Sequence, residues 1–368
     1  MIETTLEDLT TSKCISVDED EVTPLNLGMV AAYYYINYVT IELFSMSLTA
    51  KTKMRGLLEI LTAASEFDDI PIRHHEDLVL KRIADRLPVK IDNAKYNDPH
   101  VKSNILLQAH FSRIQLPPDL ESDQKLILGK IIQQIYACVD VISSHGWLSP
   151  AIAAMEFSQM CVQAILDRDS PLRQIPHLTL DSIAQLKEMK VENVFEFMEM
   201  EEADRTLVVG TDPRKNADIA RYVNRYPNVE LNFEVSENQV AQGENVTVRV
   251  VLERDVDDDE VVGCVVAPLF PGQKDEGWWL VVGDPEDKSL LAIKRTTLLK
   301  RAQVKLDFAI PENKLGKCDF KLYFMCDSYA GCDQEYDITI DVTPAAIEEV
   351  EEEDEEEGGD AMSVVEDN

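Results

Sequence analysis

Two adjacent histidines and a glutamate, His74-His75-Glu76, supply side-chain types that bind zinc in many proteins. A zinc site on a helix places its histidines four residues apart, so that both rings lie on one face. Neighbouring positions on a helix point about 100° apart, so these two rings would diverge. We therefore predict no metal site here, and no cofactor for the chain.

Motifs for nucleotide binding and hydrolysis are absent from the sequence. Gly129-Lys130 and Gly316-Lys317 hold the glycine–lysine pair of a phosphate-binding loop but lack the rest of it. No Gly-x-Gly-x-x-Gly, Gly-x-Ser-x-Gly or His-Glu-x-x-His pattern occurs, and the six histidines are scattered. We predict that this chain is not an enzyme and does not hydrolyse ATP.

Three successive tyrosines, Tyr33 to Tyr35, would stack on nucleic-acid bases if they were displayed together. On a helix they point in three directions, and we expect two of them to pack inside. The seven cysteines are odd in number and show no Cys-x-x-Cys spacing. This pattern predicts reduced, mostly buried thiols in a cytosolic or nuclear protein.

The charge balance is strongly acidic, with 69 acidic against 35 basic residues and a net charge of −34. Affinity for nucleic acid rests on clusters of lysine and arginine, so the chain alone should bind RNA weakly. We see neither a signal peptide nor an apolar run of the roughly 20 residues that a membrane span needs. The acidic segment 344–368 is predicted to be a disordered tail.

The stretch from Ser122 to Leu166 predicts two helices at the centre of a bundle. Leucine, isoleucine and valine recur in its first half at three- and four-residue spacing. Ser122 is the expected capping residue, and Gly146 the left-handed stop. Ser149-Pro150 then begins a second, mostly apolar helix. A short amphipathic helix is predicted at 1–14, before the bundle. Further bundle helices are predicted at 27–48, at 51–65 with Thr49 as its cap, at 73–86, and from Asp98-Pro99 to about 113.

The character of the chain changes after the central pair. Helices are predicted at 179–190, 194–200 and 215–226, with a polar link before the last of them. The first two surround a tight turn, Val191-Glu192-Asn193, as in a helix-hairpin-helix unit. Such a turn binds phosphate when glycines expose its backbone amides. This one has no glycine and carries Glu192, which favours a structural hairpin.

From Val229 onward the hydrophobic period switches to two, the period of strands. Turn signals separate eight short segments of this kind, which predicts a β-sandwich of immunoglobulin type without the Cys-Trp-Cys pattern of antibody domains. The predicted strands cover residues 229–235, 245–252, 261–267, 278–283, 290–294, 304–310, 319–326 and 336–342.

A helical bundle, a helical hairpin and a β-sandwich, in that order, resemble the Sec sixty-three homology unit of a branch of RNA helicases. Longer strings strengthen the resemblance and point to the helicases of the spliceosomal U5 particle. These strings are Pro24-Leu-Asn-Leu-Gly-Met-Val-Ala-Ala-Tyr-Tyr-Tyr-Ile36, Gly146-Trp-Leu-Ser-Pro150, Ala267-Pro-Leu-Phe-Pro271, Glu276-Gly-Trp-Trp279 and Gly331-Cys-Asp-Gln-Glu-Tyr336.

The resemblance implies an arrangement of parts and a setting. The parts are the end of a winged-helix region and a linker (1–22), a helical bundle (23–167), a helix-hairpin-helix-like domain (168–228), an immunoglobulin-like sandwich (229–343) and the tail. The setting is the nucleus and pre-mRNA splicing, at the C-terminal end of the second helicase cassette. The implied partners are other U5 proteins, with RNA bound only weakly or through the parent helicase, and no membrane.

Two functional hypotheses follow. In the first, the chain is a non-catalytic scaffold that holds protein partners and modulates the helicase; Trp278 and Trp279 are its candidate partner surface, with one of the two expected to be exposed. In the second, it guides single-stranded RNA along the long bundle helix. That helix is identified by position, and its candidate RNA-facing residues are Lys125, Lys130, Gln133 and Gln134. A coactivator or repair helicase of the same branch is a further alternative; an endoplasmic-reticulum translocation component fits less well, because membrane spans and a J-domain are missing.

Overall fold

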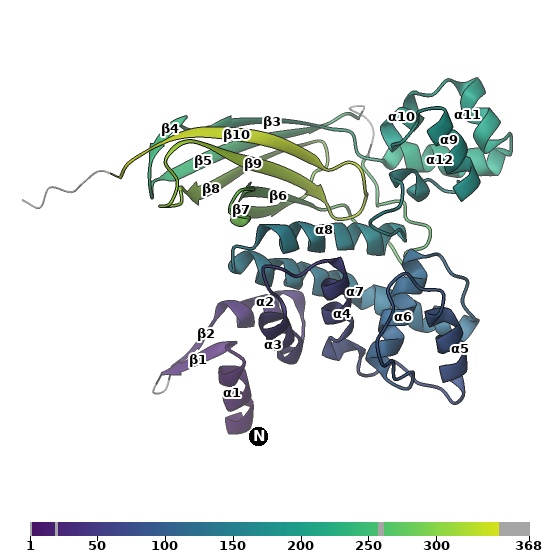
Figure 1. Cartoon of the computed structure of the whole chain (residues 1–368), viewed down its shortest axis with the longest axis horizontal. Helices are drawn as coiled ribbons and strands as arrows, with labels where there is room; N and C mark the ends of the chain where they lie inside the picture. Colours follow the sequence, from purple (N-terminus) through teal and green to yellow (C-terminus); the bar gives the residue numbers. More distant parts are fainter. Residues whose placement is uncertain (1, 19–20, 257–260, 346–368) are drawn as a thin grey trace, which may run out of the picture.

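The computed structural model describes residues 2–18, 21–256 and 261–345. Figure 1 shows two β-sheets above a group of helices, with helix α8 lying between them and a second, smaller group of helices at one end of the sheets. The predicted order of helices followed by strands is confirmed. The predicted tail lies outside the described residues apart from its first two positions.

The N-terminal segment forms one helix and a two-stranded ribbon. Helix α1 (Ile2–Thr11) is followed by β1 (Ile15–Asp18) and β2 (Glu21–Pro24), which pair antiparallel. Gly28, in the helix that follows, lies against the backbone of Cys14. A Cβ atom on Gly28 would lie 2.1 Å from the backbone oxygen of Cys14, so only glycine lets this helix pack so closely.

The predicted single helix over 27–48 is wrong: the chain forms two helices, α2 (Asn26–Tyr34) and α3 (Tyr38–Ser47). Tyr35 adopts a left-handed conformation with φ of 54° and ends the first helix. Asn37 begins the second, because its side chain accepts a hydrogen bond from the Val39 amide. The continuous apolar pattern concealed this break.

Four shorter helical segments complete the outer part of the bundle: α4 (Met54–Thr62), the 3₁₀ turn η1 (Ser65–Phe67), α5 (Glu76–Ala84) and α6 (Pro99–Phe111). Asp98 caps α6 as predicted, accepting bonds from the amides of residues 100 and 101. Helices α4 and α5 are shorter than predicted. Thr49 does not cap α4, whose N-cap is Lys53 without a side-chain bond.

The two central helices are α7 (Pro118–Ser144) and α8 (Leu148–Gln163). The expected cap at Ser122 is wrong, since α7 begins four residues earlier at a proline in its first position. Ser149 does not cap α8 either, because that helix begins at Leu148. Gly146 adopts φ of 70° between them, as the left-handed stop predicted.

Helix α7 is long and apolar enough to cross a membrane, although the sequence analysis expected no such run. In this fold, 56% of its most apolar window is buried inside the chain. Packing in the bundle therefore accounts for its composition.

A second group of helices follows: η2 (Pro171–Gln174), α9 (Leu180–Glu188), α10 (Val194–Glu199), α11 (Glu202–Val209) and α12 (Pro213–Arg225). The tight turn lies where predicted. Asn193 and Glu196 form a reciprocal capping box there, which explains why the turn needs no glycine. Helix α11 lies where a polar link was predicted. That prediction is wrong because Leu207 and the valines beside it were interpreted as part of a linker.

Eight strands make up the two larger sheets: β3 (Val229–Val235), β4 (Gln239–Ala241), β5 (Asn245–Arg254), β6 (Trp278–Asp284), β7 (Ser289–Thr296), β8 (Arg301–Ala309), β9 (Gly316–Cys326) and β10 (Gln334–Thr343). The five-stranded sheet has the order β4-β10-β9-β6-β7, and the three-stranded sheet the order β3-β5-β8. The strand predicted at 261–267 is wrong; that segment is irregular. Strand β4 was not predicted.

Two buried hydrophobic clusters hold these layers together. The first joins the bundle helices to the face of the five-stranded sheet that carries Trp279, Val281 and Met325. The second joins the inner faces of both sheets to the helices of residues 172–226. The five-stranded sheet is therefore covered on both faces, which decides where its tryptophans lie.

Candidate functional site

Three of the four predicted RNA-facing residues lie on one exposed strip of α7. Lys125, Lys130 and Gln133 are exposed, and a side chain at Gly129 between them would meet open space. Both lysines already bind within the chain. The Lys125 ammonium lies 2.7 Å from the carboxylate of Glu121, and that of Lys130 donates to the backbone oxygen of Glu66 at 2.8 Å. The strip offers little free positive charge.

The fourth predicted residue, Gln134, is not on this strip, so that assignment is wrong. It is only 1% exposed, and its amide nitrogen lies 3.4 Å from the Glu66 carboxylate. One position along a helix turns a side chain by about 100°, which carries residue 134 from the outer strip into the bundle.

The predicted partner surface at Trp278 and Trp279 is also wrong, because both residues are buried, at 0% and 2% exposure. The Trp278 ring stacks on Phe324 at 4.1 Å between centroids, inside the pair of sheets. The Trp279 ring points the other way and meets Tyr136 of α7 edge-on at 5.6 Å. The two rings point to opposite faces of the sheet, as neighbouring residues of a strand do, but helices cover the face on which Trp279 lies.

A buried carboxylate, Asp327, ties α7 to the sheet at this place. It accepts a hydrogen bond from the Tyr136 hydroxyl at 2.6 Å and pairs with Arg295 at 2.8 Å and Lys274 at 2.9 Å. The Arg295 guanidinium also lies 3.5 Å above the Tyr136 ring centre. Burial and the nearby carboxylate raise the pKa of the Tyr136 hydroxyl well above its usual value. This cluster is structural, since each of its groups is satisfied within the chain.

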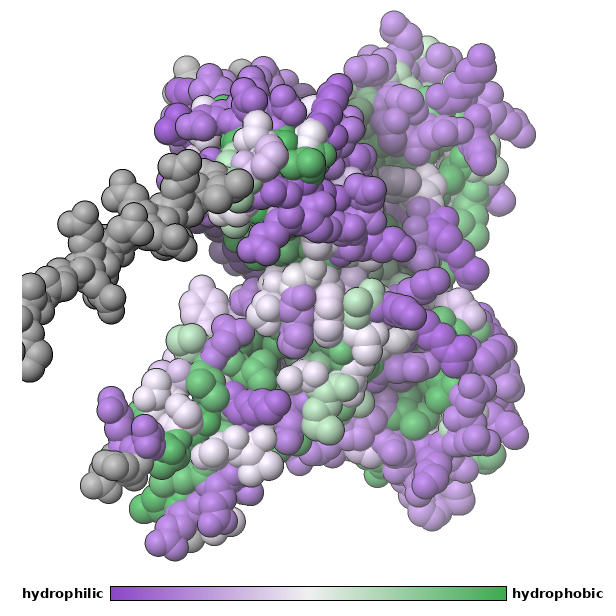
Figure 2. Space-filling view, turned by 60° about the vertical axis from the view of Figure 1, so that its left-hand side comes forward, coloured by the Kyte–Doolittle hydropathy of each residue, from purple (hydrophilic) through white to green (hydrophobic). Residues whose placement is uncertain are grey.

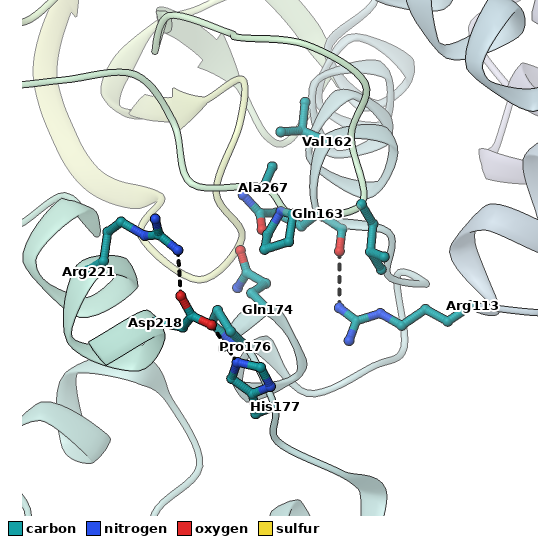
Figure 3. Close-up of a pocket in the computed structure, with 11 residues that line it drawn as sticks. Arg113, Val162, Gln163, Gln174, Pro176, His177, Asp218, Arg221 and Ala267 are labelled. Carbon is teal, nitrogen blue, oxygen red and sulfur yellow. Dashed lines mark hydrogen bonds and ion pairs between the residues drawn. The ribbon is translucent and has the colours of Figure 1, made fainter. Parts of the chain in front are cut away.

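A cavity of about 290 Å³ opens where the bundle, the second helical group and the segment 267–269 meet (Figure 3). In it, Asp218 of α12 bridges the His177 ring at 2.8 Å and Arg221 at 2.6 Å. On the other side, Arg113 donates to the backbone oxygens of Gln163 and Ala164, the last carbonyls of α8. Burial lowers the pKa of Arg113 to about 10.

A second cavity, of about 540 Å³, shares Arg113, Pro268 and Leu269 with the first and reaches Lys125 on α7. The histidine–aspartate pair has no serine or cysteine nucleophile among the cavity-lining residues. Sequence reasoning missed Arg113, His177 and Arg221, because they come from three separate segments and form no local motif.

In the described part of the chain, no group of three or more histidine, cysteine, aspartate or glutamate side chains is placed to hold a metal ion. His74 and His75 contact each other edge-on at 3.8 Å. All seven cysteines are free, and all but Cys264 are buried. Burial raises the pKa of thiols such as Cys138, which keeps them unreactive.

Comparison with known proteins decides the family, since the Sec63 Brl domain matches residues 24–339. The chain belongs to the Sec63 Brl domain family. It is 54% identical to the U5 small nuclear ribonucleoprotein 200 kDa helicases of Drosophila melanogaster, over 349 residues and 93% of this chain, and of Homo sapiens, over 347 residues and 94% of this chain. It is 49% identical to the DExH-box ATP-dependent RNA helicase DExH12 of Arabidopsis thaliana, over 347 residues and 93% of this chain.

The predicted resemblance to a Sec63 region of a spliceosomal helicase is thus confirmed. The chain spans 16% of the length of each of these relatives. The Sec63 Brl region described here lacks the ATPase motifs that a helicase requires.

Two of the three successive tyrosines are exposed on the surface of this Sec63 Brl region. Tyr33 and Tyr35 are 77% and 94% exposed, and only Tyr34 packs inside, where it donates to Asp140. The expectation that two of the three pack inside is therefore wrong. Met29, Val39 and Met46 of α2 and α3 are also exposed. Figure 2 shows hydrophobic side chains interspersed with hydrophilic ones at the N-terminal end of the chain, at the lower left of the view.

Proposed function

We propose that this chain is a non-catalytic region of a spliceosomal U5 helicase that acts in the nucleus as a scaffold for protein partners and modulates the helicase during pre-mRNA splicing. Its partners would be other U5 proteins, with RNA contacted weakly or through the parent helicase. We propose no contact with a membrane and no ATP hydrolysis by this chain.

The observation that carries this proposal is the exposed face of α2 and α3, defined by Met29, Tyr33, Tyr35, Val39 and Met46. Helix α2 contains no charged residue along its whole length. On a chain of net charge −34, an exposed uncharged strip of methionine and tyrosine is unusual. Exposed methionine and tyrosine side chains are enriched at protein contacts.

The finer fold and domain assignments support a scaffold role. Strands β3 and β4 follow each other directly, yet β3 pairs with β5 in one sheet and β4 pairs parallel with β10 in the other. An edge strand divided between two sheets in this way favours the immunoglobulin type. We keep the proposed domains at 23–167, 168–228 and 229–343. The two hydrophobic clusters cross their boundaries and would hold them as one rigid platform.

The test is a pull-down from nuclear extract with the full chain as bait, with and without ribonuclease. The variant Tyr33→Glu/Met46→Glu places charge in the exposed face of α2 and α3. The control variant Leu180→Glu/Leu207→Glu adds the same charge at exposed leucines of the second helical group. We expect U5 proteins to be captured after ribonuclease treatment, and lost with the first variant only. Equal capture by both variants would contradict the assigned surface.

Guidance of single-stranded RNA is the second candidate, favoured by the exposed strip of Lys125, Lys130 and Gln133. The cavity beside it adds Arg113. Because both lysines are bound within the chain, each RNA contact would first have to break an existing bond. Capture that disappears with ribonuclease, and that falls further in Lys125→Glu/Lys130→Glu, would support this candidate over the scaffold.

A further inference from the structure

Strand β10 has an open edge. On one side it pairs with β9 from Gln334 to Val342. On the other side β4 covers only Asp341 to Thr343. No other described strand pairs with residues 334–340 on that side. Figure 1 shows β10 running along the margin of its sheet.

The backbone of this edge is directed outward at alternate residues. The Asp341 amide donates to the backbone oxygen of Asn238 at 2.8 Å, so it points toward the β4 side. Strand geometry repeats every second residue. The N–H and C=O groups of Glu335, Asp337 and Thr339 therefore point the same way, beyond the end of β4, and are free to pair with an added strand.

The side chains along the open edge are acidic. Glu335 and Asp337 are exposed, the Asp337 carboxylate at 80%, and Lys321 is their shared partner at 3.0 and 3.9 Å. Strand β3 adds acidic groups nearby. The Phe233 ring of β3 contacts Tyr336 of β10 at 5.7 Å between ring centres. Burial, and after it the nearby Glu230 carboxylate, raise the pKa of Tyr336.

We propose that the open edge of β10 binds an extended, basic segment of a partner protein, which adds a strand to the five-stranded sheet. The backbone bonds would supply affinity, and lysine or arginine opposite Glu335 and Asp337 would supply selectivity. This inference rests on the proposed scaffold function and assigns it a second surface, separate from α2 and α3.

A second copy of this chain is a poor occupant of the same edge. Two β10 edges placed side by side would bring Glu335 and Asp337 close to the same carboxylates, and like charges on paired strands destabilise them. Charges on edge strands commonly prevent self-association in this way. A row of carboxylates along the edge also selects for a strand that carries lysine or arginine. The backbone groups of β10 beneath these carboxylates remain free to pair with such a strand.

The test uses the full chain and an acetylated peptide that alternates lysine and valine. Its control is the same peptide with alternate backbone amides methylated, which keeps the charge but cannot donate to an edge. Nuclear magnetic resonance would follow hydrogen exchange of the Glu335, Asp337 and Thr339 amides. We expect the unmodified peptide alone to slow their exchange. Equal binding of both peptides, or unchanged exchange, would overturn the proposal.

Two charge reversals separate pairing from general attraction. Asp337→Lys on the open edge should weaken peptide binding by about tenfold. Asp341→Lys changes the net charge equally, but lies where β4 already occupies the edge, and should leave binding nearly unchanged. An equal loss in both variants would reduce the effect to net charge and refute strand addition. No U5 protein enters this assay, so its failure is distinct from failure of the pull-down.

Discussion

Asp123 is buried inside the helical bundle, whereas Asp333 lies, partly buried, at the seam where α8 meets β9, and the two carboxylates have opposite partners. Asp123 receives hydrogen bonds from Arg73 and from Lys102, the latter at 2.6 Å. Asp333 receives them only from neutral amides, those of the Gln159 side chain at 2.8 Å and the Cys326 backbone at 2.7 Å.

This difference shows in their proton affinities. Burial alone would raise the pKa of Asp123, but the bonds from Arg73 and Lys102 outweigh it and lower that pKa below its usual value. Burial dominates at Asp333 and raises its pKa to about 7, against the bonds from Gln159 and Cys326. Cations stabilise a buried carboxylate in the ionised form, whereas amides in equal number do not.

The largest expected effect comes from removing the cation of the bundle cluster. Lys102 is fully buried and lies 2.7 Å from Glu76 as well as 2.6 Å from Asp123. Lys102→Met keeps the volume of the side chain but removes the buried one of the two cations that Glu76 and Asp123 share, and leaves only the partly exposed Arg73, at a cost of about 3–5 kcal/mol in unfolding free energy. Denaturant titration would measure it.

The control is Lys125→Met on the exposed strip of α7. Its partner Glu121 is also exposed, so little change in stability is expected. A loss for Lys102→Met that is no larger than the loss for this control would show that burial of the ion cluster does not matter.

The pKa of Asp333 is shifted in the opposite direction from the pKa of Asp123, so the two carboxylates should change the stability of the chain with pH in opposite directions. The folded pKa of Asp333, about 7, lies above the value of about 3.9 in an unfolded chain, so the folded state holds the proton more tightly. The stability that this proton contributes is fully present below about pH 4 and is lost as pH rises from there to about 7, above which both states are ionised and no further loss occurs. The full loss is on the order of 4 kcal/mol, because the pKa differs by about three units and each unit corresponds to about 1.4 kcal/mol.

The measurement is the unfolding free energy of the natural chain minus that of Asp333→Asn, at a series of pH values between 5 and 8 in ~1-unit steps. Taking this difference cancels the titration of all groups that the two chains share. We expect it to fall from pH 5 to about 7 and then to level off. A flat difference would mean that Asp333 is ionised throughout the range.

Local signals were enough to predict much of the fold. Asp98 before Pro99 marked the start of α6, Gly146 marked the corner between α7 and α8, and the two-residue period marked most strands. These features depend on residues close together in the chain. The break at Tyr35 was missed because a left-handed tyrosine has no sequence signature, although Asn37 is a suitable cap and could have suggested it.

The candidate site was harder to predict, because its residues are positioned by distant contacts. Asp123 looked like a residue of the first helical turn, yet its partners Lys102 and Arg73 stand 21 and 50 positions away. Trp279 looked like a displayed strand residue until α7 and α8 were found to cover the sheet. Gln134 differs from Gln133 by one position, and only the location of η1 shows which of them faces solvent.

The smallest expected effect tests whether the seam depends on one hydrogen bond. Tyr136→Phe keeps the ring beneath Arg295 and against Trp279, but removes the donor to Asp327. A hydrogen bond to a charged group contributes about 2 kcal/mol, so the unfolding free energy should fall by that amount. Tyr35→Phe, at a residue that is 94% exposed, is the matched control and should change nothing.

The pH dependence assigned to Asp333 should persist in Tyr136→Phe, because Asp333 bonds to Gln159 and Cys326 and not to Tyr136. Loss of both the hydrogen-bond energy and the pH dependence in this one variant would show that the seam opens as a unit. Retention of the pH dependence would show that Asp327, which bonds to α7, and Asp333, which bonds to α8, stabilise the contact between the helices and the sheet independently.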